Sequence, residues 1–113
     1  MCFYVPSFDT RYIENTSSIN PNDELRAELI NDYGTNGNKY NDLLFALNNK
    51  ESSMTSAQLT DQASDISNIT TSITNMGSTA DNISTDATYS DLQTIQAGLE
   101  DTYNNILTNI NNL

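Results

Sequence analysis

A regular apolar stripe through a weakly helix-forming segment is the strongest constraint that this sequence places on its fold. In residues 66–84, ISNITTSITNMGSTADNIS, eleven of the nineteen residues are Ser, Thr or Asn. Such side chains lower helix propensity because they compete for backbone hydrogen bonds. The apolar residues nevertheless recur at spacings of three and four, as in a coiled-coil seam. They are Ile66, Ile69, Ile73, Met76, Ala80 and Ile83.

This helix is predicted to be unfavourable until its apolar edge is covered. Its Ser, Thr and Asn residues, together with Gly77, cost about 6 kcal/mol relative to alanine. Burial of the four isoleucines and the methionine returns about 8–15 kcal/mol. The cover could be a following helix folded back on the stripe, or other copies of the chain. A small bundle core, a coiled coil between chains and disorder until a partner binds all stay open.

The helices on either side have recognisable ends. Asn20 as N-cap, Pro21 in the first turn and Gly34 as a stop predict a helix over 21–33. The linker GTNGN at 34–38 leads into a second predicted helix over 39–50. Residues 1–20 carry Phe3, Tyr4, Phe8 and Tyr12 and are predicted to form an irregular aromatic arm.

Two capping-box patterns predict longer helices in the amphipathic region 51–113. Thr55 with Gln58, and Ser90 with Gln93, place a hydroxyl three residues before a glutamine, which satisfies two free amides at a helix start. The predicted helices cover 56–84 and 91–112, with a break at 85–90 that is either a turn or a discontinuity in one rod. We therefore predict an all-α fold, a helical hairpin or coiled coil with two short N-terminal and two long C-terminal helices.

The charge of the chain excludes some partners. The formal net charge is −11, and all four basic residues lie in 1–50, so residues 51–113 hold acids without any Lys or Arg. Such a surface repels phosphate backbones and anionic lipid, so we expect no nucleic acid partner. No apolar run is long enough for a membrane span, and the opening MCFYVPSF lacks the basic leader of a cleaved signal peptide. We expect no membrane insertion.

The residue types argue against an enzyme and against a metal site. The chain has no histidine and a single cysteine, Cys2, which removes His-dependent triads, Cys/His zinc sites and internal disulfides. The loop 32–43 has the spacing of a calcium loop in part, but Leu43 stands where a bidentate glutamate is needed. We predict no catalytic residues, no metal site and no cofactor.

The last segment, DLQTIQAGLEDTYNNILTNINNL at 91–113, resembles the C-terminal part of the EspA-like filament proteins of type III secretion systems. Leu92, Gln93, Ile95 and Ala97 match the family's LQ-x-[IV]-x-A run, whereas Gln96 stands where the family usually has a lysine. The chain is shorter than those subunits and lacks their strongly hydrophobic N-terminal helix. The resemblance implies a subunit that a cytoplasmic chaperone keeps unpolymerised, that is exported without a cleaved signal, and that assembles through paired terminal helices.

The predicted function is that of a structural, self-assembling subunit of an extracellular filament or fibre. Its partners would be copies of itself and, before export, a chaperone; without export it would be cytoplasmic. The alternatives are a small acidic adaptor or chaperone-like binding module, and a phage fibre-type trimeric rod. The residues predicted to form the assembly interface are Leu59, Ile66, Ile69, Ile73, Met76, Ile83, Leu92, Ile95, Leu99, Ile106 and Ile110.

Overall fold

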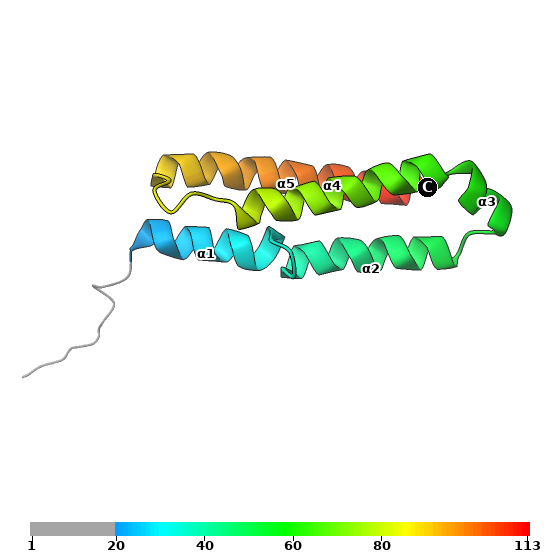
Figure 1. The fold of residues 1–113 in the computed structure, drawn as a ribbon, viewed down its shortest axis with the longest axis horizontal. Coiled ribbons are helices and arrows are strands. Elements are labelled where there is room, and N and C mark those ends of the chain that lie inside the picture. Colours follow the sequence, from blue (N-terminus) through cyan, green and yellow to red (C-terminus); the bar gives the residue numbers. More distant parts are fainter. Residues whose placement is uncertain (1–19) are drawn as a thin grey trace, which may run out of the picture.

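The computed structural model describes residues 20–113, and the predicted aromatic arm therefore lies almost entirely outside the described residues. The fold is all-α, as the sequence predicts. The helices, drawn in Figure 1, are α1 (Pro21–Tyr33), α2 (Asn38–Ser52), α3 (Ser56–Asp61), α4 (Ala63–Asp81) and α5 (Tyr89–Asn111).

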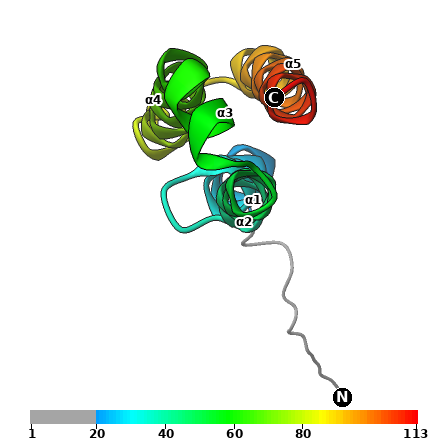
Figure 2. The ribbon, with the colours of Figure 1, turned by 90° about the vertical axis from the view of Figure 1, so that its right-hand side faces the viewer.

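The long helices form a bundle of three rods. α1 and α2 follow each other along one rod, while α4 and α5 make the other two (Figure 1). Seen from the end, the rods stand at the corners of a triangle (Figure 2). α1 and α2 both contact α4 and α5, and α4 contacts α5. α4 runs antiparallel to the other two rods, so the break predicted at 85–90 is a turn that sends the chain back, over residues 82–88, and not a discontinuity in a rod.

α1 forms with the predicted bounds, for the predicted reasons. The Asn20 side chain accepts a hydrogen bond of 2.8 Å from the amide of Asn22, and Pro21 occupies the first turn. At the other end the Gly34 amide donates to the Ile30 carbonyl at 2.9 Å. The residues that α1 buries, Leu25, Leu29 and Tyr33, are spaced by four and form one face.

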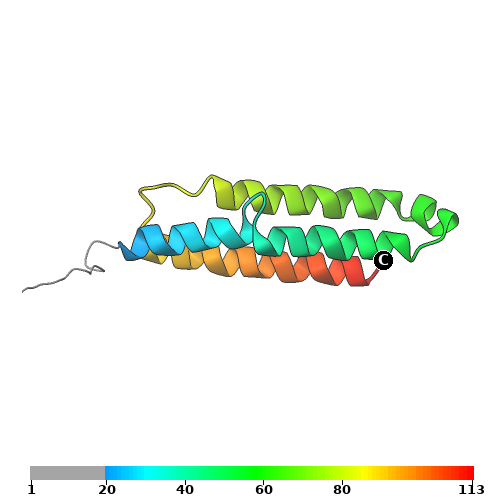
Figure 3. The ribbon, with the colours of Figure 1, turned by 90° about the horizontal axis from the view of Figure 1, so that it is seen from below.

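The linker between α1 and α2 is fastened to α4. Asn36 adopts a positive φ of 92°, and the adjoining backbone amide of Thr35 donates to both carboxylate oxygens of Asp81 at 3.3 Å. A Cβ on Gly77 would lie only 2.6 Å from Cε2 of Tyr40. Figure 3 shows the linker reaching from the rod of α1 and α2 towards α4. The break in the first rod is therefore an anchored contact with α4.

Two sequence predictions in the C-terminal half are wrong in detail. The single helix predicted over 56–84 is interrupted at Gln62, whose φ and ψ are −107° and 14°, so α3 and α4 are separate. α3 buries no residue, which leaves no core contact to hold it in line with α4. The capping box at Thr55 and Gln58 is confirmed. The start of α5, however, is Thr88 paired with Asp91, not Ser90 with Gln93.

The Ser- and Thr-rich helices satisfy many of their own hydroxyls. Thr70 donates to the Ile66 carbonyl at 3.0 Å, and Thr74 to the Thr70 carbonyl at 3.1 Å. Thr102 does the same with the Gly98 carbonyl at 2.8 Å. A hydroxyl bonded to its own helix, four residues back, needs no partner from outside. These polar residues therefore tolerate contact with a neighbouring protein surface.

The apolar stripe lies in the core. All of the rods contribute to one cluster of buried side chains. Its members are Leu25, Leu29, Tyr33, Leu43, Leu47, Ile69, Ile73, Met76, Ala80, Ile83, Leu92, Leu99, Ile106 and Ile110. The cover that the weak α4 helix requires is thus supplied by α1, α2 and α5 of the same chain.

Candidate interaction surfaces

Most of the residues predicted to form an assembly interface are buried in this core. Only Leu59, Ile66 and Ile95 are partly exposed. The other eight, from Ile69 to Ile110, are at most 9% exposed. In this fold they hold the chain's own helices together and present little surface to a second molecule. A contact between copies must therefore use a different surface or open the bundle.

A groove between α4 and α5, which we call the α4/α5 groove, is such a surface. Its central hollow has a volume of 390 Å³. The residues that line the centre are Ser72, Asn75, Met76, Thr79, Ile95, Gly98, Leu99 and Thr102. A second hollow shares Ser72 and continues to Leu113, and a third shares Ile95 and continues to Ser84. The first two hollows are lined by both helices, and the third extends the groove along the loop before α5 and the start of α5.

Gly98 gives this groove an open wall. A Cβ built on Gly98 would meet no heavy atom within 4 Å. Gly77, in contrast, lacks a side chain because Tyr40 and Thr35 pack against its Cα. A glycine inside a helix costs about 0.5–1 kcal/mol relative to alanine. The packing of the single chain needs a glycine at position 77, where a side chain would clash, but not at position 98.

The walls of the α4/α5 groove are nearly uncharged. Among residues 20–113, no charged side chain lines the central hollow. Asp65 lines the hollow at one end, and Asp86 and Asp91 line the hollow at the other. Hydroxyl and amide groups occupy the remaining polar positions.

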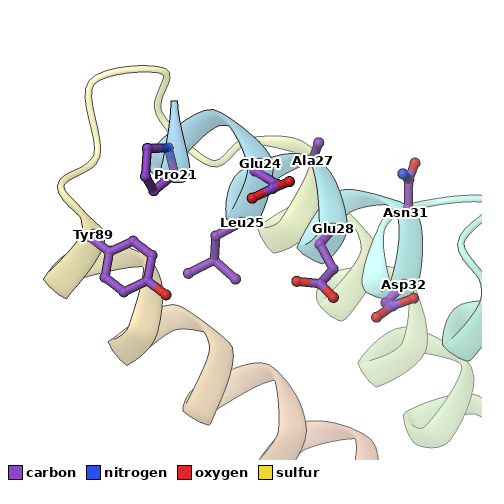
Figure 4. A pocket seen from close by; sticks show the side chains of 8 residues that line it. All are labelled: Pro21, Glu24, Leu25, Ala27, Glu28, Asn31, Asp32 and Tyr89. Carbon is purple, nitrogen blue, oxygen red and sulfur yellow. The ribbon is translucent and has the colours of Figure 1, made fainter. Parts of the chain in front are cut away.

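A second groove, between α1 and α5, is lined by several charged side chains. Its outer hollow, with a volume of 680 Å³, is lined by Pro21, Glu24, Leu25, Ala27, Glu28, Asn31, Asp32 and Tyr89. Figure 4 shows Tyr89 across this hollow from the side chains of α1. An inner hollow shares Glu28 and Asp32 and adds Leu29, Tyr33, Lys39, Gln96, Glu100, Tyr103 and Asn104. We call the two hollows together the α1/α5 groove.

The inner end of the α1/α5 groove holds the chain's own cation between aromatic rings. The Lys39 ammonium lies 5.1 Å from the centroid of the Tyr103 ring and 5.9 Å from that of Tyr33, within the range of cation–π attraction. Tyr33 is only 4% exposed. Burial raises the pKa of its phenol above 10.0, and the charges of Glu100 and Asp32, with Tyr103, raise it further. Tyr33 is therefore a neutral hydroxyl at physiological pH.

The described residues were also compared with the requirements of a metal site and of a membrane-spanning helix. Within residues 20–113, no three His, Cys, Asp or Glu side chains are grouped so that they could hold a metal ion. In the same part of the chain, every helix is too short or too polar to cross a bilayer.

Sequence reasoning missed the two residues that distinguish these surfaces. Gly98 interrupts a helical pattern and Tyr89 directly follows a helix cap, but neither position reveals in the sequence what lies across from it.

Comparisons of the chain with models of known protein families, with curated proteins and with solved structures found no match.

Proposed function

We propose that this chain is a structural assembly subunit whose copies associate through the α4/α5 groove. The observation that carries the proposal is Gly98, a mid-helix glycine in the wall of a long groove where the chain's own packing leaves space for a side chain. An element packed over Gly98 would explain why no side chain is present there, since glycine lets another backbone approach closely.

The shape of the groove suits a helix. Two neighbouring helices form a channel in which a further helix completes a bundle, with axes about 8–10 Å apart. Small residues line the central hollow on both sides, with Ser72 on α4 and Gly98 on α5. The hydroxyl of Thr102, also at this hollow, is already bonded to the Gly98 carbonyl. Contact there would leave that hydroxyl satisfied.

A second copy is the partner that matches the uncharged walls. Two copies related by a twofold axis would bring the same Ser-, Thr- and Asn-flanked surface to each side of the contact. Like-charge repulsion is low at the centre of this groove, because its acids lie only towards the ends. The chain's net charge of −11 still opposes association, so salt should strengthen it by screening.

The biological setting of such an assembly rests on the resemblance of residues 91–113 to the EspA-like filament proteins. An extracellular filament or fibre, with a chaperone holding the subunit before export, is the setting that the resemblance supports. A phage fibre-type trimeric rod is less well supported, because its long parallel helices would have to replace the antiparallel turn between α4 and α5.

Sedimentation of the chain over a range of concentrations and salt tests the proposal. We expect association that grows with concentration and with salt, and that Gly98→Leu abolishes by filling the groove. Ala97→Leu is the matched control, because it introduces the same side chain at the neighbouring exposed position, outside the hollows described. A chain that stays monomeric at every concentration and salt, or association lost equally in both variants, would refute the proposal.

A further inference from the structure

A row of carboxylates on α1 lies along the α1/α5 groove, and within residues 20–113 none of them forms an ion pair. Glu24, Glu28 and Asp32 are spaced by four residues, which places them on one helix face about 6 Å apart along the axis. All three line the outer hollow (Figure 4). Like charges at this spacing weaken a helix. The row therefore works against the stability of α1 as long as the groove is empty.

Each basic residue of the described chain makes another contact, and of the three only Lys39 lines this groove. Arg26 donates to Asp23 at 3.0 Å and to the Thr85 carbonyl at 3.4 Å. Lys39 lies over the Tyr33 and Tyr103 rings, and Lys50 donates to the Asn111 carbonyl at 3.5 Å. Among residues 20–113 the ion pair of Arg26 with Asp23 is the single one present. The row of carboxylates is thus not paired with any basic residue of the described part of the chain.

Apolar and aromatic surface lies beside this charge. Tyr89 is 45% exposed, although it is a large side chain. Together with Leu25, Ala27 and Pro21 it gives the outer hollow an apolar part next to the carboxylates (Figure 4). A partner that fits here must offer both positive charge and apolar side chains. Inorganic cations and small amines supply only the charge.

The inner hollow provides a second, independent indication. The Tyr33 side chain is buried and lines the hollow, yet its hydroxyl makes no hydrogen bond to any other residue in 20–113. Because Tyr33 lines an open hollow, its hydroxyl is available to water or to a polar group of a partner. Lys39 also demonstrates that an ammonium group is accepted between the two tyrosine rings. The groove therefore holds one cation of the chain itself beside a tyrosine hydroxyl that a partner can reach.

We infer that the α1/α5 groove binds a basic amphipathic helix of another protein. Its Lys or Arg residues would recur every fourth position, so that they match the spacing of Glu24, Glu28 and Asp32, and its apolar side chains would pack on Tyr89 and Leu25. The inference does not depend on the proposed self-association, which uses the other face of α5. Complementary charge would speed the encounter and fix the orientation of the bound helix.

The test uses the whole chain and a synthetic helix of about 18 residues, with Lys at every fourth position and Leu beside each Lys. Binding is followed by NMR, through shifts of backbone amides, and by titration. We expect the largest shifts at α1 and at the start of α5. We also expect Glu24→Lys with Glu28→Lys to weaken binding about 10-fold or more, since two attractions become repulsions.

The matched control carries the same change of net charge at exposed acids outside both grooves, Asp61→Lys with Asp101→Lys. It should retain more than half of the wild-type affinity. The gentler pair Glu24→Gln with Glu28→Gln removes the repulsion along α1, so it keeps the test valid if the lysine variant fails to fold. Binding should weaken with salt, opposite to self-association. Equal weakening in both lysine variants, or shifts centred on the α4/α5 groove, would overturn the inference.

Discussion

The two glycines of the long helices offer a direct test of the packing, because they should respond oppositely to the same substitution. Gly→Ala in a helix interior gains about 0.5–1 kcal/mol from lower backbone entropy in the unfolded chain. At Gly98 the new methyl group meets no atom within 4 Å, so this gain should appear in full. At Gly77 the Cβ would lie 2.6 and 2.9 Å from two Tyr40 ring carbons and 3.1 Å from Oγ1 of Thr35.

The gain from helix propensity is common to both variants, so the difference between them isolates the contact with Tyr40. Overpacking of this kind costs about 1–3 kcal/mol. We therefore expect Gly77→Ala to have a free energy of unfolding about 1–3 kcal/mol below that of Gly98→Ala, when both are measured by urea denaturation of the dilute monomer.

The cause can be checked with a double-mutant cycle. In a Tyr40→Ala background the ring is gone, and Gly77→Ala should then stabilise the chain as Gly98→Ala does. If Gly77→Ala is as stable as Gly98→Ala in the wild-type background, the close approach of α2 to α4 is not as described. If the deficit of Gly77→Ala persists without the ring, its origin lies elsewhere.

Three further predictions concern the core, a cap and a buried phenol. Ile73→Asp should abolish the helical circular dichroism signal, because Ile73 is 0% exposed and an unpaired carboxylate there costs several kcal/mol; Thr74→Asp, at an exposed neighbour, should leave it largely intact. Thr88→Ala should lower the free energy of unfolding by about 1 kcal/mol through loss of the cap on α5, whereas Thr85→Ala in the preceding loop should not. Because the folded pKa of Tyr33 lies above its unfolded value of 10.0, stability from the neutral phenol is complete below that pH and falls as pH rises towards the folded pKa. As pH rises above 10.0, the free energy of unfolding of Tyr33→Phe should therefore fall less than that of the wild type, which denaturation curves at alkaline pH would measure.

Local signals in the sequence located most helix ends correctly. Asn20, Pro21 and Gly34 act within a turn of the ends that they mark, so they define α1 without reference to the remainder of the chain. The start of α5 was misplaced because Thr88 with Asp91 and Ser90 with Gln93 are both plausible local caps. The interruption at Gln62 was missed because no Gly or Pro marks it in the sequence. It separates α3, which buries no residue, from α4, which packs into the core.

The sequence by itself determined that the chain is helical and which edge of each helix is apolar, because the spacing of side chains around a helix is fixed by its geometry. It could not determine what covers those edges, because burial of apolar surface is favourable against any protein surface and carries no direction. The tertiary structure decided this by folding α5 back on α4, which put eight of the eleven predicted interface residues into the core. It also separated two glycines that look alike in the sequence, since Gly77 faces Tyr40 and Gly98 faces open space.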